Sequence, residues 1–349
     1  MDIKKNISIK NKLWAIILVA QFSFFYILSK IDFAVNFFSN LFEWKKNIHI
    51  LLFSKFGFSV GDVLYTVAVI FLSFHIINLL RKRNSKTLKS LLIFINIFYL
   101  IYQSFWGMLY FQTPMIDKLQ KKEITNQDLK NLAVKYLALC KESREKVSEN
   151  NLGIFVIKDL RKIESEILVQ QTHIPANITL KTPIKVISVK PSIFGRAMNY
   201  TGISGYYNPF TAESQFDSEM PHTQIPFTLA HEMSHQLGFA KEQEASFIAY
   251  LCSRNSVNKD LRYSAQLYVL KSLLRSLAKN DGDFVKKILS QYSTKMQKDR
   301  NNELAFIRKH EGLLSDIFGF TNDLFLKSNQ QDGSITYSYF ITLLVLYET

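Results

Sequence analysis

Two histidines four positions apart, with a glutamate directly after the first, are the residues of this sequence best suited to chemistry. His231, Glu232 and His235 lie in the stretch LAHEMSHQLGFAKEQEASFIAYL, residues 229–251. Residues four apart on an α-helix share a face, so the two imidazoles would point the same way and could bind one zinc ion. Glu232 could then act as general base on a zinc-bound water, which is the chemistry of the HExxH pattern.

The residues around this pattern favour a buried helix over a surface helix that carries two histidines by chance. Pro226 can open the helix, and Phe227 and Leu229 are apolar. Gly238 can end the helix in a left-handed conformation. Buried histidine and glutamate side chains without partners would be costly, so a metal ion is the expected partner.

A catalytic zinc site uses three protein ligands and leaves one position open, and two glutamates follow the histidines. Glu242 would share a helical face with Ala245, Ser246 and Ala249, whose small side chains allow close packing against the HExxH helix. Glu244 would point about 200° away from Glu242 on the same helix. The sequence therefore predicts Glu242 as the third ligand of Zn²⁺, with Glu244 as the alternative.

Three long hydrophobic runs precede this region. They are Leu13–Ile31, Val60–Leu80 and Leu91–Phe111, and each is long enough to span a bilayer, which takes about 20 helical residues. The basic N-terminus and the basic loop 81–89 predict that both lie in the cytoplasm, which puts everything after the third run outside. The segment FAVNFFSNLF, residues 33–42, is too short for a span and is expected to lie along the membrane interface.

The formal net charge of +14 is compatible with a nucleic-acid or a membrane partner. The sequence contains no nucleic-acid-binding motif, and much of its positive charge flanks the hydrophobic runs. We therefore expect a lipid bilayer as partner and no nucleic acid. The only two cysteines, Cys140 and Cys252, provide neither a disulfide framework nor a zinc knuckle.

The remaining chain predicts a mainly α fold with a small β-sheet (α+β), and a division into a membrane domain (1–112) and an extracytoplasmic domain (113–349). Thr125 is a plausible N-cap of one helix, and Ile154–Leu168 is expected to form another. Alternating apolar residues at 184–190 predict a strand. The apolar C-terminal run ITYSYFITLLVLY is too short to span and is expected to pack as a helix.

The stretch EQEAS, residues 242–246, resembles the E-x-x-A-(D/N) pattern with which several gluzincin metallopeptidases complete their HExxH site. Glu242 and Ala245 match it, and Ser246 stands in place of the acidic or amide residue. Residues 200–264 also resemble a family of bacterial membrane proteins known only as a domain of unknown function. Lys241 stands where a metzincin would carry its third ligand, so the sequence does not resemble that clan.

The resemblance implies three transmembrane helices followed by a gluzincin-like zinc-peptidase domain, in the bacterial inner (cytoplasmic) membrane with the C-terminal domain extracytoplasmic. We expect a zinc metallopeptidase that hydrolyses peptide bonds of a protein or peptide substrate, with His231, His235 and Glu242 as metal ligands and Glu232 as catalytic base. One alternative is a membrane-anchored structural or binding protein with non-catalytic zinc. Another is a zinc amidase or esterase that acts on envelope components.

Other residues allow a functional and a structural interpretation. Gly205–Asn208 could form an edge strand that binds extended substrate, or a turn with aromatic packing. Tyr263 could donate a hydrogen bond to an oxyanion, although a core tyrosine is the favoured interpretation. Asp62 lies near the end of the second hydrophobic run and is expected at the membrane interface.

Overall fold

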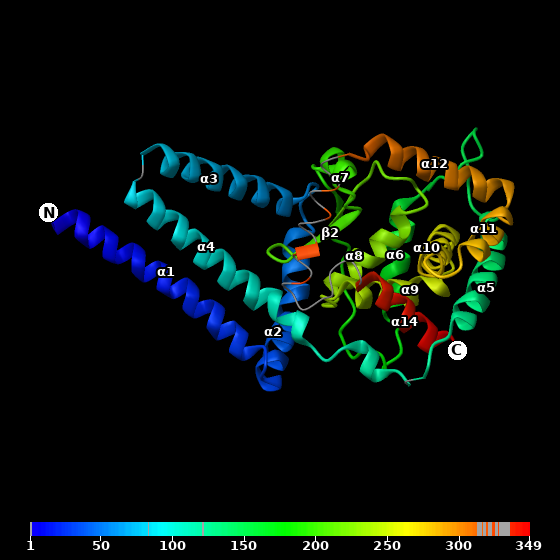
Figure 1. The fold of residues 1–349 in the computed structure, drawn as a ribbon, viewed down its shortest axis with the longest axis horizontal. Helices are drawn as coiled ribbons and strands as arrows, with labels where there is room; N and C mark the ends of the chain where they lie inside the picture. Colours follow the sequence, from blue (N-terminus) through cyan, green and yellow to red (C-terminus); the bar gives the residue numbers. More distant parts are fainter. Residues whose placement is uncertain are drawn as a thin grey trace.

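The structure is a computed structural model that describes residues 2–82, 84–120, 122–312 and 336–349, with isolated positions between the last two ranges. An elongated bundle of helices lies on one side and a rounder body on the other (Figure 1). The described elements are mainly helices with one small sheet, which confirms the predicted fold class.

The bundle is built from the long N-terminal helices. These are α1 (Asp2–Leu28), α2 (Asp32–Phe53), α3 (Val60–Lys82) and α4 (Ser85–Phe105). Of the described helices, α1, α3 and α4 are long and apolar enough to cross a membrane. The third span ends at Phe105, so its predicted end at Phe111 was wrong. Trp106 leaves helical geometry with φ −144°, and the next residues form a short 3₁₀ helix, η1 (Gly107–Phe111), most of which is buried.

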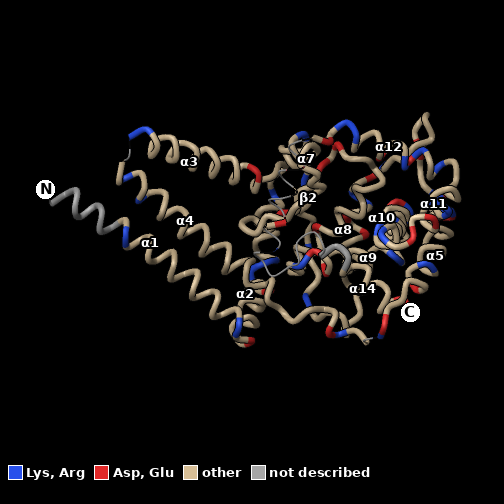
Figure 2. Tube along the Cα trace, in the orientation of Figure 1, with Lys and Arg blue, Asp and Glu red and all other residues tan. Residues whose placement is uncertain are grey.

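The basic ends of the spans lie together, at the end of the bundle farthest from the rounder body. The Asn11 side-chain amide donates a hydrogen bond to the Ser85 carbonyl oxygen at 2.9 Å, which brings α1 next to the start of α4. Lys and Arg residues mark this end of the bundle (Figure 2). Both basic segments therefore lie on the same side of the bundle, as the predicted topology requires.

Helix α2 crosses the opposite ends of the spans instead of running alongside them (Figure 1). One of its faces packs into the protein through Phe42 and Ile50, which are buried. The other face carries an exposed apolar stripe formed by Phe33, Phe37, Trp44, Ile48, Leu51 and Leu52. The segment 33–42, expected along the membrane interface, is the first half of this two-faced helix.

The rounder body contains η1, η2 (Met115–Lys118), α5 (Asn126–Arg144), α6 (Leu160–Gln171), β1 (Val189–Pro191), α7 (Gly195–Thr201), β2 (Gly205–Asn208), β3 (Glu213–Phe216), α8 (Ile225–Gln236), α9 (Glu242–Arg254), α10 (Lys259–Leu277), α11 (Gly282–Ser290), α12 (Thr294–His310) and α14 (Thr336–Glu348). The predicted N-cap Thr125 begins α5 with a capping box to Asp128. The C-terminal run packs as helix α14 with Leu344 and Val345 buried, as predicted.

Two boundaries differ from the predictions. The helix expected to begin at Ile154 is α6, which begins at Leu160 because the Asp159 side chain caps it by accepting from the Lys162 backbone N–H. Of the predicted strand 184–190, only its last two residues pair, in β1. Apolar alternation therefore located the strand but overestimated its length.

The sheet has the strand order β1-β3-β2, with β1 parallel and β2 antiparallel to the central strand β3. Helix α8 packs against β2 and β3. The Ser214 hydroxyl of β3 donates to the Glu232 carbonyl oxygen at 2.9 Å, and the Gln236 amide donates to the Ala212 carbonyl oxygen at 2.9 Å. These bonds fix the HExxH helix against the sheet.

One hydrophobic core joins the helices of the rounder body to parts of the N-terminal segment. Phe42 of α2 and Trp106 and Tyr110 beyond α4 belong to the same cluster as residues of α5, α8, α9, α10 and α14. The core therefore includes residues on both sides of position 112. The division into domains 1–112 and 113–349 stays a prediction.

Polar contacts tie the first turn of α3 to the sheet. The Asp62 carboxylate is buried and accepts hydrogen bonds from the Ser192 hydroxyl at 3.0 Å, the Ile193 backbone N–H at 2.8 Å and the Tyr206 hydroxyl of β2. The Glu213 carboxylate accepts from the Gly61 backbone N–H at 2.6 Å. Asp62 is therefore a buried structural residue at the end of α3, and the expectation of an interfacial side chain that reaches out toward solvent was wrong.

Candidate metal centre

Helix α8 begins and ends where its sequence favours a boundary. Pro226 lies in the first turn, where a missing N–H breaks no helical hydrogen bond. Gly238 has φ +100°, a conformation that favours glycine. The Gly238 N–H bonds to the His235 carbonyl oxygen at 2.8 Å, and the Phe239 N–H to the Ser234 carbonyl oxygen at 3.3 Å. This pair of bonds is the Schellman motif, and it confirms the predicted helix end.

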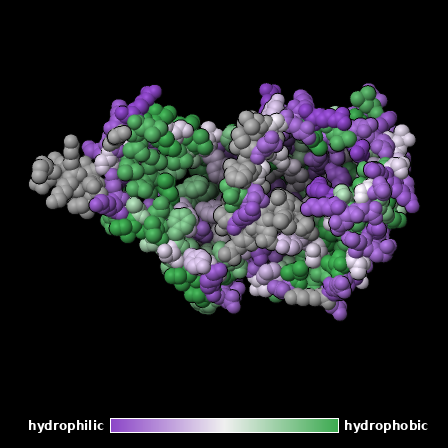
Figure 3. Space-filling model, in the orientation of Figure 1, coloured by the Kyte–Doolittle hydropathy of each residue, from purple (hydrophilic) through white to green (hydrophobic). Residues whose placement is uncertain are grey.

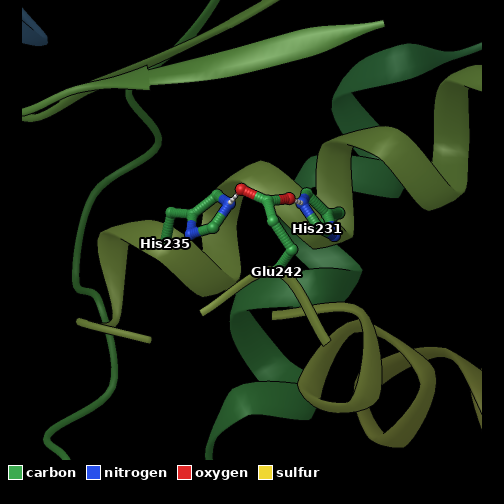
Figure 4. Close-up of side chains that lie close together, drawn as sticks. All are labelled: His231, His235 and Glu242. Atoms are coloured by element: carbon green, nitrogen blue, oxygen red, sulfur yellow. Dashed lines mark hydrogen bonds and ion pairs between the residues drawn. The ribbon is translucent and has the colours of Figure 1, made fainter. Parts of the chain in front are cut away.

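Helix α9 packs closely on α8 through its small face, on which Ala245 and Ala249 are buried. The packing brings the Glu242 carboxylate between the two imidazoles (Figure 4). Glu242 Oε2 lies 3.1 Å from His231 Nε2, and Oε1 lies 3.6 Å from His235 Nε2. One ligand atom from each of the three residues lies within 4.8 Å of the others, so the group could hold a metal ion.

The second nitrogen of each imidazole is also held. His235 Nδ1 lies 2.6 Å from the Phe239 carbonyl oxygen, which the turn at Gly238 directs back toward the ring. His231 Nδ1 lies 3.1 Å from the Ser246 hydroxyl, which lies 3.4 Å from the Tyr268 hydroxyl. Such partners orient metal-binding histidines. The Ser246 hydroxyl contacts the histidine where the related pattern has an acidic or amide residue.

The contacts of His235 fit a cation. Because a carbonyl oxygen only accepts, Nδ1 must carry a proton, and in the neutral imidazole Nε2 then keeps its lone pair. That lone pair faces a carboxylate oxygen of Glu242 at 3.6 Å. Two acceptors that face each other are satisfied by a positive ion between them. Two imidazole nitrogens and one carboxylate oxygen are also a ligand set that zinc uses in hydrolases.

The Glu232 carboxylate is buried beside this group, with only 4% of the residue exposed. Within the described part of the chain, its Oε2 has no hydrogen-bond partner. Strand β2 passes directly over it, since a Cβ atom at Gly205 would lie 2.8 Å from Glu232 Oε1. A side chain at position 205 would therefore displace the carboxylate.

Burial and neighbouring charges shift the pKa values of Glu232, His235 and Glu242. Burial raises the pKa of Glu232 to about 8, with a further increase from the Glu242 charge against the opposing effect of His231. Burial lowers the pKa of His235 to about 4, despite the attraction of Glu242. Burial alone would raise the pKa of Glu242, but the two histidines hold it below its ordinary value. A neutral His235 and an ionised Glu242 are the forms that bind a metal ion.

Two other candidates lie away from this group. The Glu244 carboxylate accepts a hydrogen bond from the Met115 backbone N–H at 2.8 Å. The Tyr263 hydroxyl donates to Asp299 Oδ2 at 2.7 Å, and Tyr263 is buried in the core. The structure thus brings His231, His235 and Glu242 together and leaves Glu244 and Tyr263 outside the group.

Aromatic residues from the end of α4 complete the surroundings of the site. The Trp106 ring lies 5.7 Å from the His235 ring in an edge-to-face arrangement, and its Nε1 donates to the Tyr110 hydroxyl at 3.3 Å. Burial, with a contribution from the Glu242 charge, raises the pKa of Tyr110. Sequence reasoning missed both residues, because they are far from the HExxH motif along the chain.

The comparisons with known proteins identify a family and assign no activity. Among curated proteins and among solved structures, none matches this chain. Residues 37–345 match a family that is described as "Protein of unknown function (DUF3810)", and this match includes α3, α4 and the whole candidate metal centre. The chain therefore belongs to the DUF3810 family.

Proposed function

We propose that this protein is a membrane-bound zinc metallopeptidase. The observation that carries the proposal is the convergence of His231, His235 and Glu242 beside the buried carboxylate of Glu232. A site that only stabilises a fold needs no such carboxylate. The spans would lie in the cytoplasmic membrane, with the basic ends inside and residues 113–349 outside.

His231 Nε2, His235 Nε2 and the Glu242 carboxylate would hold the zinc ion. When bound, zinc supplies Lewis acidity, which polarises a substrate carbonyl and lowers the pKa of a water molecule. Phe239 and Ser246 keep the two rings oriented, so little reorganisation is needed on binding.

Glu232 would transfer a proton from the attacking water to the leaving amine. Its carboxylate would accept a proton from the attacking water as the oxygen adds to the peptide carbonyl carbon. The same proton would pass to the amide nitrogen as the C–N bond breaks, which leaves one carboxylic acid and one amine. The buried position beside the ligand group supports this role, because a base must lie within hydrogen-bond reach of the proton it takes.

Strand β2 would bind the substrate chain. Within the described part of the chain it pairs only with β3, so its other edge can accept an extended peptide. Gly205, at the start of this strand, lies over Glu232. A peptide added to this edge would therefore pass close to the proposed base.

The test combines metal analysis with a peptide-library cleavage assay on purified full-length protein. The wild type should contain about one zinc per chain and cut the library. Glu232→Gln should keep the zinc and lose cleavage by about 10²–10⁴-fold, the usual contribution of a general base. Glu123→Gln, at an exposed carboxylate, is the matched control and should behave like the wild type.

The outcomes separate this proposal from the alternatives. Unchanged cleavage by Glu232→Gln would remove that residue as the base. A protein that binds zinc and cuts no peptide would leave a non-catalytic site, or an amidase or esterase, which ester and amide substrates of envelope components would reveal.

A further inference from the structure

We infer that the substrates are polypeptides anchored in the same membrane, cut a few residues beyond the point where they leave the bilayer. This inference rests on the proposed peptidase function and specifies its substrate class. It follows from how closely the candidate metal centre lies to the ends of the spans.

Strand β2 separates the metal centre from the membrane bundle. Successive residues of a strand face opposite sides, and β2 follows this rule. Gly205 lies over Glu232 on one side. On the other side, the Tyr206 hydroxyl donates to Asp62 in the first turn of α3, and a Cβ atom at Gly61 would lie 2.5 Å from Asn208 Nδ2. One layer of backbone therefore lies between the proposed base and the end of a membrane span.

The end of α4 also lies close to the candidate metal centre. Trp106 directly follows the last residue of this span, and its ring contacts both the His235 ring at 5.7 Å and the Tyr207 ring at 4.5 Å. The residue connecting a span to the rounder body is thus part of the wall around a metal ligand.

The turn between β2 and β3 enters the membrane bundle itself. The Phe210 ring lies 4.4 Å from the Phe98 ring of α4 and 6.3 Å from the Tyr65 ring of α3. Phe98 and Tyr65 both lie within the candidate spans. The hairpin that would bind the substrate is therefore anchored between two spans at their outer ends.

The apolar stripe of α2 places the membrane surface next to the same region. This helix crosses the outer ends of the spans and exposes large apolar side chains, including Trp44, a residue type that favours the membrane interface (Figure 1). The apolar surface of the bundle continues up to the rounder body (Figure 3). Lipid is the expected partner of this stripe, because an exposed apolar face on a helix next to membrane spans favours the acyl boundary.

These contacts place the candidate metal centre close to the ends of the spans. Trp106 directly follows the last residue of α4, and its ring lies 5.7 Å from the His235 ring, a distance that an extended chain covers in about two residues. A segment that leaves the bilayer beside this protein therefore needs only a few residues to reach the candidate metal centre. A segment far from its own anchor spends most of its time elsewhere.

The experiment uses the full-length protein and its substrates in the same lipid vesicles. One cleavable segment is presented 4 residues or 40 residues after a transmembrane helix, joined by a flexible glycine–serine linker, and also as a free peptide. The segment is the best sequence from the peptide library or, if the free library is not cut, the library itself fused after the helix. Both anchored forms have the same density in the membrane, so they differ only in distance from the bilayer.

We expect initial cleavage of the near segment to exceed that of the far segment by about tenfold or more, because effective concentration falls steeply with tether length. Glu232→Gln should abolish cleavage of both. Equal rates for near and far segments, with the free peptide also cut, would overturn the inference and leave the peptidase proposal intact. If the zinc-loaded wild type cuts none of the three forms, the peptidase proposal fails and the inference fails with it.

Discussion

The two neighbouring glutamates of α9 provide the sharpest test of the metal centre, because the structure gives them different tasks. Glu242 contacts both imidazoles, at 3.1 and 3.6 Å. Glu244 accepts from the buried Met115 N–H at 2.8 Å. Each therefore serves as the matched control for the other, two residues away in the same helical turn.

Glu242→Ala should lower zinc affinity by at least about 100-fold. Loss of a residue that only supports a metal ligand already costs about 10–100-fold, and Glu242 would be a ligand itself. Unfolding of the metal-free protein should change little, since the substitution also removes a carboxylate that is partly buried. Zinc affinity is measured by competition with a chromogenic chelator in detergent.

Glu244→Ala should have the opposite profile. The Met115 N–H would lose its acceptor inside the protein, which costs about 1–3 kcal/mol in free energy of unfolding. Zinc affinity should stay within about threefold of the wild type. Thermal unfolding in excess chelator measures the stability of both variants. Weakened zinc binding in Glu244→Ala with normal binding in Glu242→Ala would refute the ligand assignment.

Three further predictions concern the surrounding structure. Gly238→Ala should destabilise the protein by about 1–3 kcal/mol in thermal or denaturant unfolding, because its φ is +100° and the new Cβ would lie 2.7 Å from Phe42; an unchanged midpoint would refute this role of the turn. Burial raises the pKa of the Cys140 thiol and raises that of the Cys252 thiol to about 12. Both thiols should therefore resist maleimide in the folded protein and react after unfolding. Mass spectrometry measures the labelling, and rapid labelling of the folded protein would contradict this prediction. Burial lowers the pKa of Lys45 from 10.5 to about 7, so the native state binds fewer protons than the unfolded chain between these values. Lys45→Met should therefore raise the unfolding temperature most below pH 7 and progressively less up to pH 10; a gain that grows with pH would have the wrong sign.

The sequence was informative where the determinants of structure are local. Proline and glycine bounded α8 correctly, and the small face of α9 identified Glu242, rather than Glu244, as the residue that approaches the histidines. The capping box at Thr125 also appears as expected. Each of these features depends on residues within about one or two helical turns, so a single sequence contains enough information to predict them.

The remaining features depend on contacts between distant segments. Nothing near Trp106 in the sequence indicates that its ring contacts His235, and its hydropathy made it look like part of a span. Asp62 resembled an interfacial residue because its partners, Ser192 and Tyr206, lie far along the chain. Such tertiary contacts cannot be read from periodicity, which reports only on neighbouring residues.

The shared core has a consequence for biosynthesis. Phe42 and Trp106 pack at the C-terminal end of α8 and leave the ribosome before the histidines do. Each is close in sequence to a candidate span, so we expect both to reach their positions when these spans enter the bilayer. In a chain whose N-terminal helices are not inserted, Phe42 would not pack at Gly238 and Trp106 would not contact the His235 ring. Assembly of the candidate metal centre would then depend on membrane insertion, so a copy left outside the bilayer would lack a complete ligand group.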